Sequence, residues 1–276
     1  MNILQIYPKA DYFTGAAMQL RDLAAGLAAR GHHVVVATRP SAQWERSCAA
    51  SRVRYAAVPM RGSLDLRSAW TLARLIRDQH VEVVHCQKGR ARSLALLAGL
   101  VTTIPVMILN RGVSFPVDRW TRLGYTTPRV AAIVAVCESI KRGLVASGVP
   151  AAKIDVIYSG TDLARFHPGV DGRRIRAELG LAPDHALVTQ VGIRSWRGND
   201  DVLEAMARVC HAAPHARLLF VGAPPPRIPT LRDRAFRRGI GHAVSVLGHR
   251  EDIWSADEKF RAHVTGGIRW ALGMED

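Results

Sequence analysis

The sequence predicts an α/β fold built from two Rossmann-like domains. Short apolar, largely β-branched runs alternate with amphipathic stretches, which is typical of a parallel sheet covered by helices on both faces. After a segment with little periodicity the same alternation starts again, and 276 residues are enough for a second domain. The chain is therefore expected to contain two sheets, each with its candidate site residues where strands end.

The first domain is expected at residues 1–158. Residues 3–7 form a strand, and the leucines of residues 16–30 fall on one face of a helix that Gly31 ends. The remaining expected strands are 34–38, 81–85, 106–109, 130–136 and 154–158, and the remaining helices are 66–79, 91–100 and 138–147.

Residues 159–172 include Pro168 and lack periodicity, so they are expected to be a linker. Residues 173–252 then repeat the pattern, with strands at 186–191, 218–221 and 244–247 and helices at 200–212 and 230–238. This second domain is expected to be incomplete, and residues 253–276 are expected to be an atypical C-terminal tail.

The chain is strongly basic, with 38 lysines and arginines against 23 acidic residues and a formal net charge of +15. Such an excess favours an anionic partner. The arginines are scattered, and no nucleic-acid-binding motif accompanies them, so nucleic acid is not expected. Phosphorylated small molecules and peripheral contact with anionic lipid headgroups are the expected partners.

No feature of the sequence predicts a membrane span, a leader or a disulfide. No apolar run reaches the ~18 residues of a transmembrane helix, and the N-terminus enters a strand directly. The protein is expected to be cytoplasmic, with peripheral contact at the inner face of the cell membrane. Four widely spaced cysteines are expected to be free thiols: Cys48, Cys86, Cys137 and Cys210.

Candidate ligand-binding residues lie at the expected carboxyl ends of strands. Gly15 opens a helix among small residues, where a ligand can approach backbone N–H groups, although no GxGxxG is present. Arg194 and Arg197 follow a strand and can neutralise a diphosphate. Gly222 follows the next strand, and we expect it to bind the same ligand as Arg194 and Arg197.

His85 and Arg111 are the candidates for catalysis. His85 is expected to end its strand, where it can bind a substrate hydroxyl or move a proton, or serve only as a structural hydrogen-bonding group. Arg111 follows the next strand and can hold an anionic acceptor or the reacting phosphate, or be an ordinary loop arginine. Metal-ligand spacing and nucleophile motifs are missing, so neither a metal nor a cofactor is expected.

Several segments taken in order resemble the GT-B glycosyltransferases of family 4. They are GAAMQLRDLAAGLAARGHHVVVAT, VEVVHCQKGRARSLALLAG, VAAIVAVCESIKRGLVASGVPAAKIDVIYSGTDLARFHP and VGIRSWRGNDDVLEA, with ARLLFVG and VSVLGHREDI after them, so the resemblance covers about residues 1–253. It implies two Rossmann-like domains facing across a cleft, with the acceptor on the first and the donor on the second. It also implies retaining transfer from a nucleotide-sugar to a cell-envelope polysaccharide or lipid-linked acceptor.

The resemblance also suggests roles for individual residues. Arg194 and Arg197 resemble the basic pair that grips the donor diphosphate, although the second is usually lysine. Gly15 corresponds to the glycine beside the donor phosphates. Arg111 stands where many members have histidine before glycine, which puts the usual acceptor-side histidine in doubt. In this scheme the donor phosphate assists deprotonation of the acceptor hydroxyl.

The sequence departs from the family near its end. The family's E-x7-E segment is not matched, because six residues separate Glu251 from Glu258 and the accompanying glycines are missing. The last ~20 residues instead resemble the end of a trehalose-utilisation (ThuA-like) domain. Little or no transferase activity is therefore expected of this chain. An inactive truncated or fused remnant that binds nucleotide weakly stays open, as does a nucleotide-sugar 2-epimerase.

Overall fold

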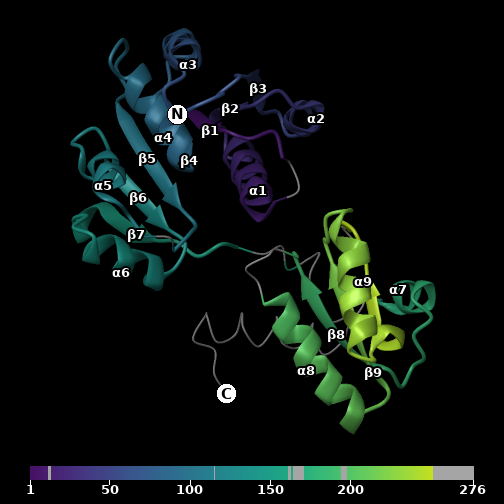
Figure 1. Cartoon of the computed structure of the whole chain (residues 1–276). Helices are drawn as coiled ribbons and strands as arrows, with labels where there is room; N and C mark the ends of the chain where they lie inside the picture. Colours follow the sequence, from purple (N-terminus) through teal and green to yellow (C-terminus); the bar gives the residue numbers. More distant parts are fainter. Residues whose placement is uncertain (12–13, 115, 161–162, 164–170, 194–197, 251–276) are drawn as a thin grey trace. The chain divides into compact units, whose positions relative to one another are not determined.

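The computed structural model describes residues 1–11, 14–114, 116–160, 163, 171–193 and 198–250, and the chain divides into two compact units (Figure 1). Unit 1 is Met1–Gly160 and unit 2 is Thr161–Asp276. Each unit contains a parallel sheet, which confirms the predicted α/β class. The finer domain and linker boundaries stay predictions.

Unit 1 is built on a seven-stranded sheet in the order β3-β2-β1-β4-β5-β6-β7, and each neighbouring pair is parallel. The change of direction at β1 places β1 and β4 side by side, with their carboxyl ends at one edge of the sheet. The strands are β1 (Asn2–Tyr7), β2 (His33–Thr38), β3 (Arg54–Ala57), β4 (Val83–Gln87), β5 (Val106–Arg111), β6 (Ala132–Ala135) and β7 (Ile154–Val156).

Helices pack on both faces of this sheet because side chains alternate along each strand. On one face Tyr7 and Val36 join the core of α1 and α2. On the other face Leu4 and Ile6 join the core of α3, α4, α5 and α6. The helices are α1 (Gly15–Ala29), α2 (Ala42–Ala50), α3 (Leu66–Asp78), α4 (Gly89–Ala98), α5 (Arg119–Thr126) and α6 (Glu138–Ala146), and the 3₁₀ turn η1 (Ala151–Lys153) precedes β7.

Unit 2 has a three-stranded parallel sheet in its described residues, in the order β10-β9-β8. Leu203 and Met206 of α8 pack with Leu231 and Ala235 of α9 in its larger core. The elements are α7 (Arg173–Glu178), β8 (Ala186–Val191), α8 (Asn199–Ala212), β9 (Ala216–Val221), α9 (Arg227–Arg237), η2 (Gly241–Ala243) and β10 (Val244–Val246).

The structure corrects the sequence prediction in several places. β4 continues two residues beyond His85 to Gln87, so His85 lies inside the strand rather than at its end. The stretch between β5 and β6 contains the helix α5, which Asp118 caps by accepting from the N–H of Thr121. Three further elements were not predicted, namely α2, β3 and α7. All of them are short.

Candidate functional site

Gly15 is the first residue of α1 and follows the carboxyl end of β1. Thr14 caps this helix by accepting a hydrogen bond from the N–H of Ala17. A Cβ atom added at Gly15 would meet no atom within 4 Å among the described residues, and its φ is not in the left-handed region. Neither packing nor backbone conformation therefore requires glycine here, and the space is open for a ligand at the helix N-terminus.

Tyr7 fixes the turn that leads to Gly15. Its ring is fully buried, and its hydroxyl donates to Asp11 Oδ1 at 2.9 Å and lies 3.1 Å from Thr14 Oγ1. Burial raises the pKa of the Tyr7 hydroxyl well above its usual range. Trp44 Nε1 donates to the Asp11 carbonyl at 3.3 Å and holds the turn from the α2 side.

Lys88 lies between β4 and α4 in a backbone conformation that suits glycine. Its φ is 79° and its ψ is 161°, a region that non-glycine residues enter at a cost of about 1–3 kcal/mol. Its Nζ lies 5.8 Å from the centroid of the Tyr7 ring, and Lys9 Nζ lies 3.7 Å from Asp11 Oδ2. Burial and the nearby charge of Lys9 lower the pKa of Lys88. The sequence analysis missed this lysine, since nothing in the residue pattern reveals the strain.

His85 belongs to a polar group on the sheet. Its Nε2 lies 3.5 Å from Gln87 Nε2, and Asn110 Nδ2 of β5 donates to Gln87 Oε1 at 2.6 Å. Burial lowers the pKa of His85 to about 4, so the ring is neutral at pH 7 and better suited to hydrogen bonding than to proton transfer. Gln87 and Asn110 were not predicted as site residues, because their pairing depends on the register of β4 and β5.

Arg111 is the last residue of β5, as expected for a group at this edge. Its Nη1 donates to the Tyr125 hydroxyl at 3.3 Å, and its Cζ lies 5.9 Å from the centroid of that ring. Arg92 of α4 lies over the same ring at 4.6 Å and donates to the Thr121 carbonyl at 3.2 Å. Arg92 is 9% exposed, and a Cβ at Gly124 would come within 2.6 Å of its Nε, so α5 accommodates the guanidinium only because of that glycine.

In unit 2 a glycine follows each of the strands β8 and β9. Gly192 and Gly222 have φ angles of +80° and +81°. Gly192 N–H donates to the Val221 carbonyl at 2.8 Å, and Gly222 N–H donates to the Gly248 carbonyl at 2.9 Å. Gly222 is therefore required by its backbone conformation, and its role in nucleotide binding stays a prediction. Arg194 and Arg197 lie outside the described residues.

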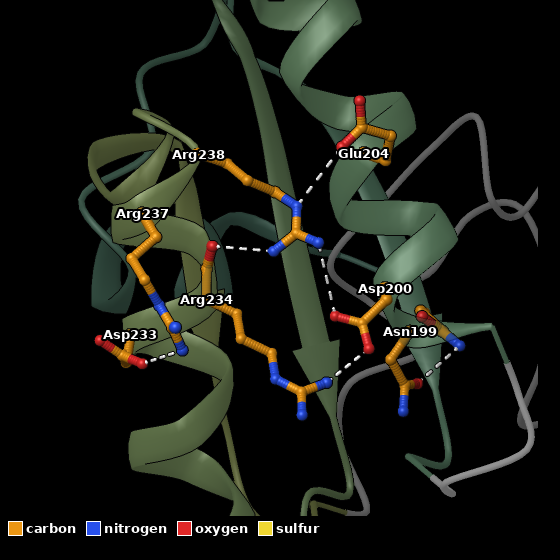
Figure 2. Close-up of polar contacts among 8 residues, drawn as sticks. Asn199, Asp200, Glu204, Asp233, Arg234, Arg237 and Arg238 are labelled. Atoms are coloured by element: carbon orange, nitrogen blue, oxygen red, sulfur yellow. Dashed lines mark hydrogen bonds and ion pairs between the residues drawn. The ribbon is translucent and has the colours of Figure 1, made fainter.

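The first turn of α8 is joined to α9 by ion pairs (Figure 2). Asp200 pairs with Arg234 and, at 3.7 Å, with Arg238, which also lies 3.5 Å from Glu204. The helix begins at Asn199, which is 6% exposed and accepts from Gln190 Nε2 at 3.2 Å. The N-cap residue Gly198 has a left-handed backbone conformation and makes no side-chain cap hydrogen bond to the helix.

Three further properties concern the described residues only. They hold no group of three or more His, Cys, Asp or Glu side chains that could bind a metal ion. No helix in them is both long and apolar enough to cross a bilayer. The four cysteines are free, as predicted, and burial raises the pKa of Cys86 to about 12 and that of Cys48 to about 11, so these two thiols are unreactive.

Residues 13–165, which run from the turn before α1 past the end of unit 1, match Glycosyltransferase Family 4. The chain belongs to glycosyltransferase family 4. In this family 4 chain the match covers Gly15, Lys88 and the polar group around His85, together with Arg111.

Curated relatives match this family 4 chain over short stretches. A D-inositol 3-phosphate glycosyltransferase of Segniliparus rotundus is 51% identical over 71 residues, which is 25% of this chain and 16% of that protein. The protein of the same name from Nocardia farcinica is 36% identical over 107 residues, 36% of this chain and 24% of that protein. The chain thus aligns with a quarter or less of each relative.

Solved structures match both units of the family 4 chain. Anabaena HepE in complex with UDP-glucose has a TM-score of 0.77 at 16% identity and covers 93% of this chain and 72% of that one. A glycosyltransferase of Rickettsia africae has a TM-score of 0.76 at 18% identity, covering 92% and 69%. These likenesses show the GT-B fold predicted from the sequence, with the second domain present in part.

Proposed function

We propose that this chain belongs to a retaining glycosyltransferase that takes a sugar from a nucleotide-sugar and passes it to a hydroxyl group. The observation that carries the proposal is Gly15, a glycine at the start of α1 that the described structure does not itself require, in a family 4 chain. The space above it suits a phosphate or sugar at the helix N-terminus. Anabaena HepE, whose fold this chain shares, was solved with UDP-glucose, which supports a nucleotide-sugar donor.

The proposed chemistry needs no protein nucleophile and no metal. The bond between the sugar C1 and the donor phosphate breaks, and the acceptor oxygen bonds to C1 on the same face. The acceptor proton passes to an oxygen of the departing phosphate. Arg194 and Arg197 stabilise the diphosphate as negative charge develops on it. Arg111 holds an anionic acceptor at the edge of unit 1, and neutral His85 binds a hydroxyl rather than taking its proton.

We propose a cell-envelope polysaccharide or lipid-linked acceptor. WaaG, a solved structure of the same fold, is described as involved in lipopolysaccharide biosynthesis, which supports this class. The formal charge of +15 suits peripheral contact with anionic lipid on the inner face of the membrane. The curated relatives are named for inositol 3-phosphate, so a phosphorylated cyclitol is the second acceptor class to test.

A second candidate function is nucleotide binding without sugar transfer. It is favoured by the spacing of Glu251 and Glu258, which does not reproduce the E-x7-E pattern of the family. In the family those carboxylates contact the donor sugar and the ribose, so a chain in which they are missing would lose both donor affinity and turnover.

Calorimetric titration of the full chain with UDP and UDP-glucose tests donor binding, and release of UDP in the presence of acceptors tests transfer. We expect Arg194→Ala to abolish binding of UDP. Arg237→Ala is the matched control, because Arg237 is an exposed arginine paired with Asp233 on the surface of α9. Equal affinity of the Arg194→Ala variant and the native chain for UDP would contradict the proposed donor site. UDP binding without UDP release would select the second candidate.

A further inference from the structure

Four polar side chains lie together on one face of the unit 1 sheet, close to its carboxyl edge. Gln5 of β1 is in register with His85 of β4, and Gln87 of β4 is in register with Asn110 of β5. Side chains two apart on a strand point the same way, so His85 and Gln87 share this face. Gln5 is 1% exposed and Gln87 5% exposed, which is unusual for amides beside an apolar core.

The hydrogen bonds in this group run in one direction. The Asn110 amide donates to Gln87 Oε1 at 2.6 Å. An amide nitrogen can only donate, so the 3.5 Å contact between Gln87 Nε2 and His85 Nε2 makes the ring nitrogen the acceptor. The proton of neutral His85 is then on Nδ1, in agreement with a pKa lowered by burial to about 4.

This arrangement of hydrogen bonds leaves two oxygen acceptors of the group unused. Within the described residues, Asn110 Oδ1 and Gln5 Oε1 are both buried and have no hydrogen-bond partner. A buried acceptor without a donor is destabilising, so such atoms need a reason to persist. What both oxygens lack is a donor, and a hydroxyl group supplies one.

The hydrogen bonds seen within the group join neutral side chains only, namely Gln87, His85 and Asn110. A phosphate or carboxylate cannot donate a hydrogen bond to Asn110 Oδ1. Its negative charge would also be repelled by the partial negative charge of that oxygen. A polyol can donate to that oxygen and also accept from neighbouring N–H groups. The cations Lys88 and Arg111 lie at the edge, outside this set of hydrogen bonds.

We propose that Gln5, His85, Gln87 and Asn110 form an uncharged subsite that binds the hydroxyls of a neutral sugar or cyclitol ring, with Asn110 Oδ1 accepting from one of them. Asn110 is then a specificity-determining residue. The inference deepens the proposed function and rests on it for the identity of the ring as part of the acceptor. In this proposal Arg111 and Lys88 bind any charged substituent of the ligand, and the amide side chains bind the hydroxyls of the ring.

Saturation-transfer NMR on the full chain tests the subsite with myo-inositol and methyl α-glucopyranoside as neutral probes. We expect both probes to bind the native chain, and Asn110→Leu to weaken them about fivefold to tenfold because a buried oxygen acceptor is lost. Asn110→Asp keeps oxygen acceptors at this position but loses the N–H that donates to Gln87 Oε1, so it should retain more of the probe binding than Asn110→Leu does. Gln79→Leu is the matched control, since Gln79 is an amide that bonds to Arg54 at the end of α3.

Equal loss in Asn110→Leu and Asn110→Asp would show a packing effect and overturn the proposal, as would undiminished binding in Asn110→Leu. Failure of the native chain to bind either probe would also overturn it. Titration with UDP in the same samples tests the donor site separately. Binding of UDP without binding of the polyols would overturn the subsite proposal and leave the proposed donor site standing. Thermal unfolding midpoints of each variant show whether the fold is kept.

Discussion

The two sheets end in different ways. At the carboxyl edge of unit 1, side chains hold one another in place, with Tyr7 bonded to Asp11 and Asn110 to Gln87. At the same edge of unit 2, β8 and β9 are followed by Gly192 and Gly222, which have positive φ angles and no side chains. Side chains can distinguish one ring from another, whereas the N–H groups of Gly192 and Gly222 already donate to the Val221 and Gly248 carbonyls and hold the backbone turns in place. In the proposed function, ring specificity therefore comes from unit 1, and the arginines assigned to unit 2, Arg194 and Arg197, hold the donor diphosphate.

Acidification should weaken unit 1 through His85. Its pKa falls from 6.5 to about 4 on folding, so between these pH values the unfolded chain binds more protons than the folded one. The stabilisation is present above pH 6.5 and is lost as the pH falls toward 4, by up to about 3 kcal/mol. Urea unfolding of the native chain and His85→Gln from pH 7 to pH 4 measures this. An equally steep pH dependence in the variant would exclude His85 as its source.

Gly222→Val should weaken unit 2. Valine at a φ of +81° costs about 2 kcal/mol, because a β-branched side chain is strained in this region. Denaturant unfolding and UDP titration should both show the loss. Gly62→Val is the control, since Gly62 has room for a side chain among the described residues and no positive φ. If Gly222→Val unfolds like the control, the idea that unit 2 depends on bare backbone fails.

Lys88→Gly should stabilise the chain by about 1 kcal/mol. It relieves the strained φ of 79°, and the added freedom of glycine in the unfolded state offsets part of the gain. Lys88→Ala removes the same charge but keeps the strain, so the difference between the two variants isolates the backbone term. If the ammonium binds an anionic acceptor, both variants lose that affinity equally. If the unfolding midpoint of Lys88→Gly is at or below that of Lys88→Ala, the backbone at residue 88 is not strained.

The smallest effect is expected at the ion pairs of α8 and α9. Asp200→Asn should cost about 0.5 kcal/mol at low salt, because the side chains of Asp200 and Arg234 are about half exposed to solvent. At 1 M NaCl the difference from the native chain should vanish, as screening removes the attraction. Chemical unfolding at both salt concentrations measures this. A penalty that persists in high salt would mean that Asp200 acts by packing.

The sequence predicts most of the fold because the elements around the core carry strong periodicity. The apolar runs of β1 and β2 and the leucine stripe of α1 are of this kind. The helix α5 was not predicted because its sequence, RWTRLGYT, has no aliphatic stripe, although the capping residue Asp118 precedes it in the sequence. The short elements α2 and β3 were not predicted either, because they too lack a clear apolar periodicity.

The candidate site is predictable only where it depends on strand ends. Gly15 and Arg111 lie where the expected strands stop, and the sequence identifies both. The pairing of Gln87 with Asn110 depends on register, and the strain at Lys88 depends on a dihedral angle, so neither can be read from one sequence. The roles assigned to Arg194, Arg197 and Gly222 remain predictions.

Arg92 and Gly124 limit how this protein can change over evolutionary time. The guanidinium lies against Tyr125 in space that exists only because residue 124 has no side chain. Replacing Gly124 displaces the arginine, and replacing Arg92 leaves a void between α4 and α5. Each single step is harmful, so descendants that differ here should have changed both positions. The two sites are thus inherited as one, although 32 positions separate them in the chain.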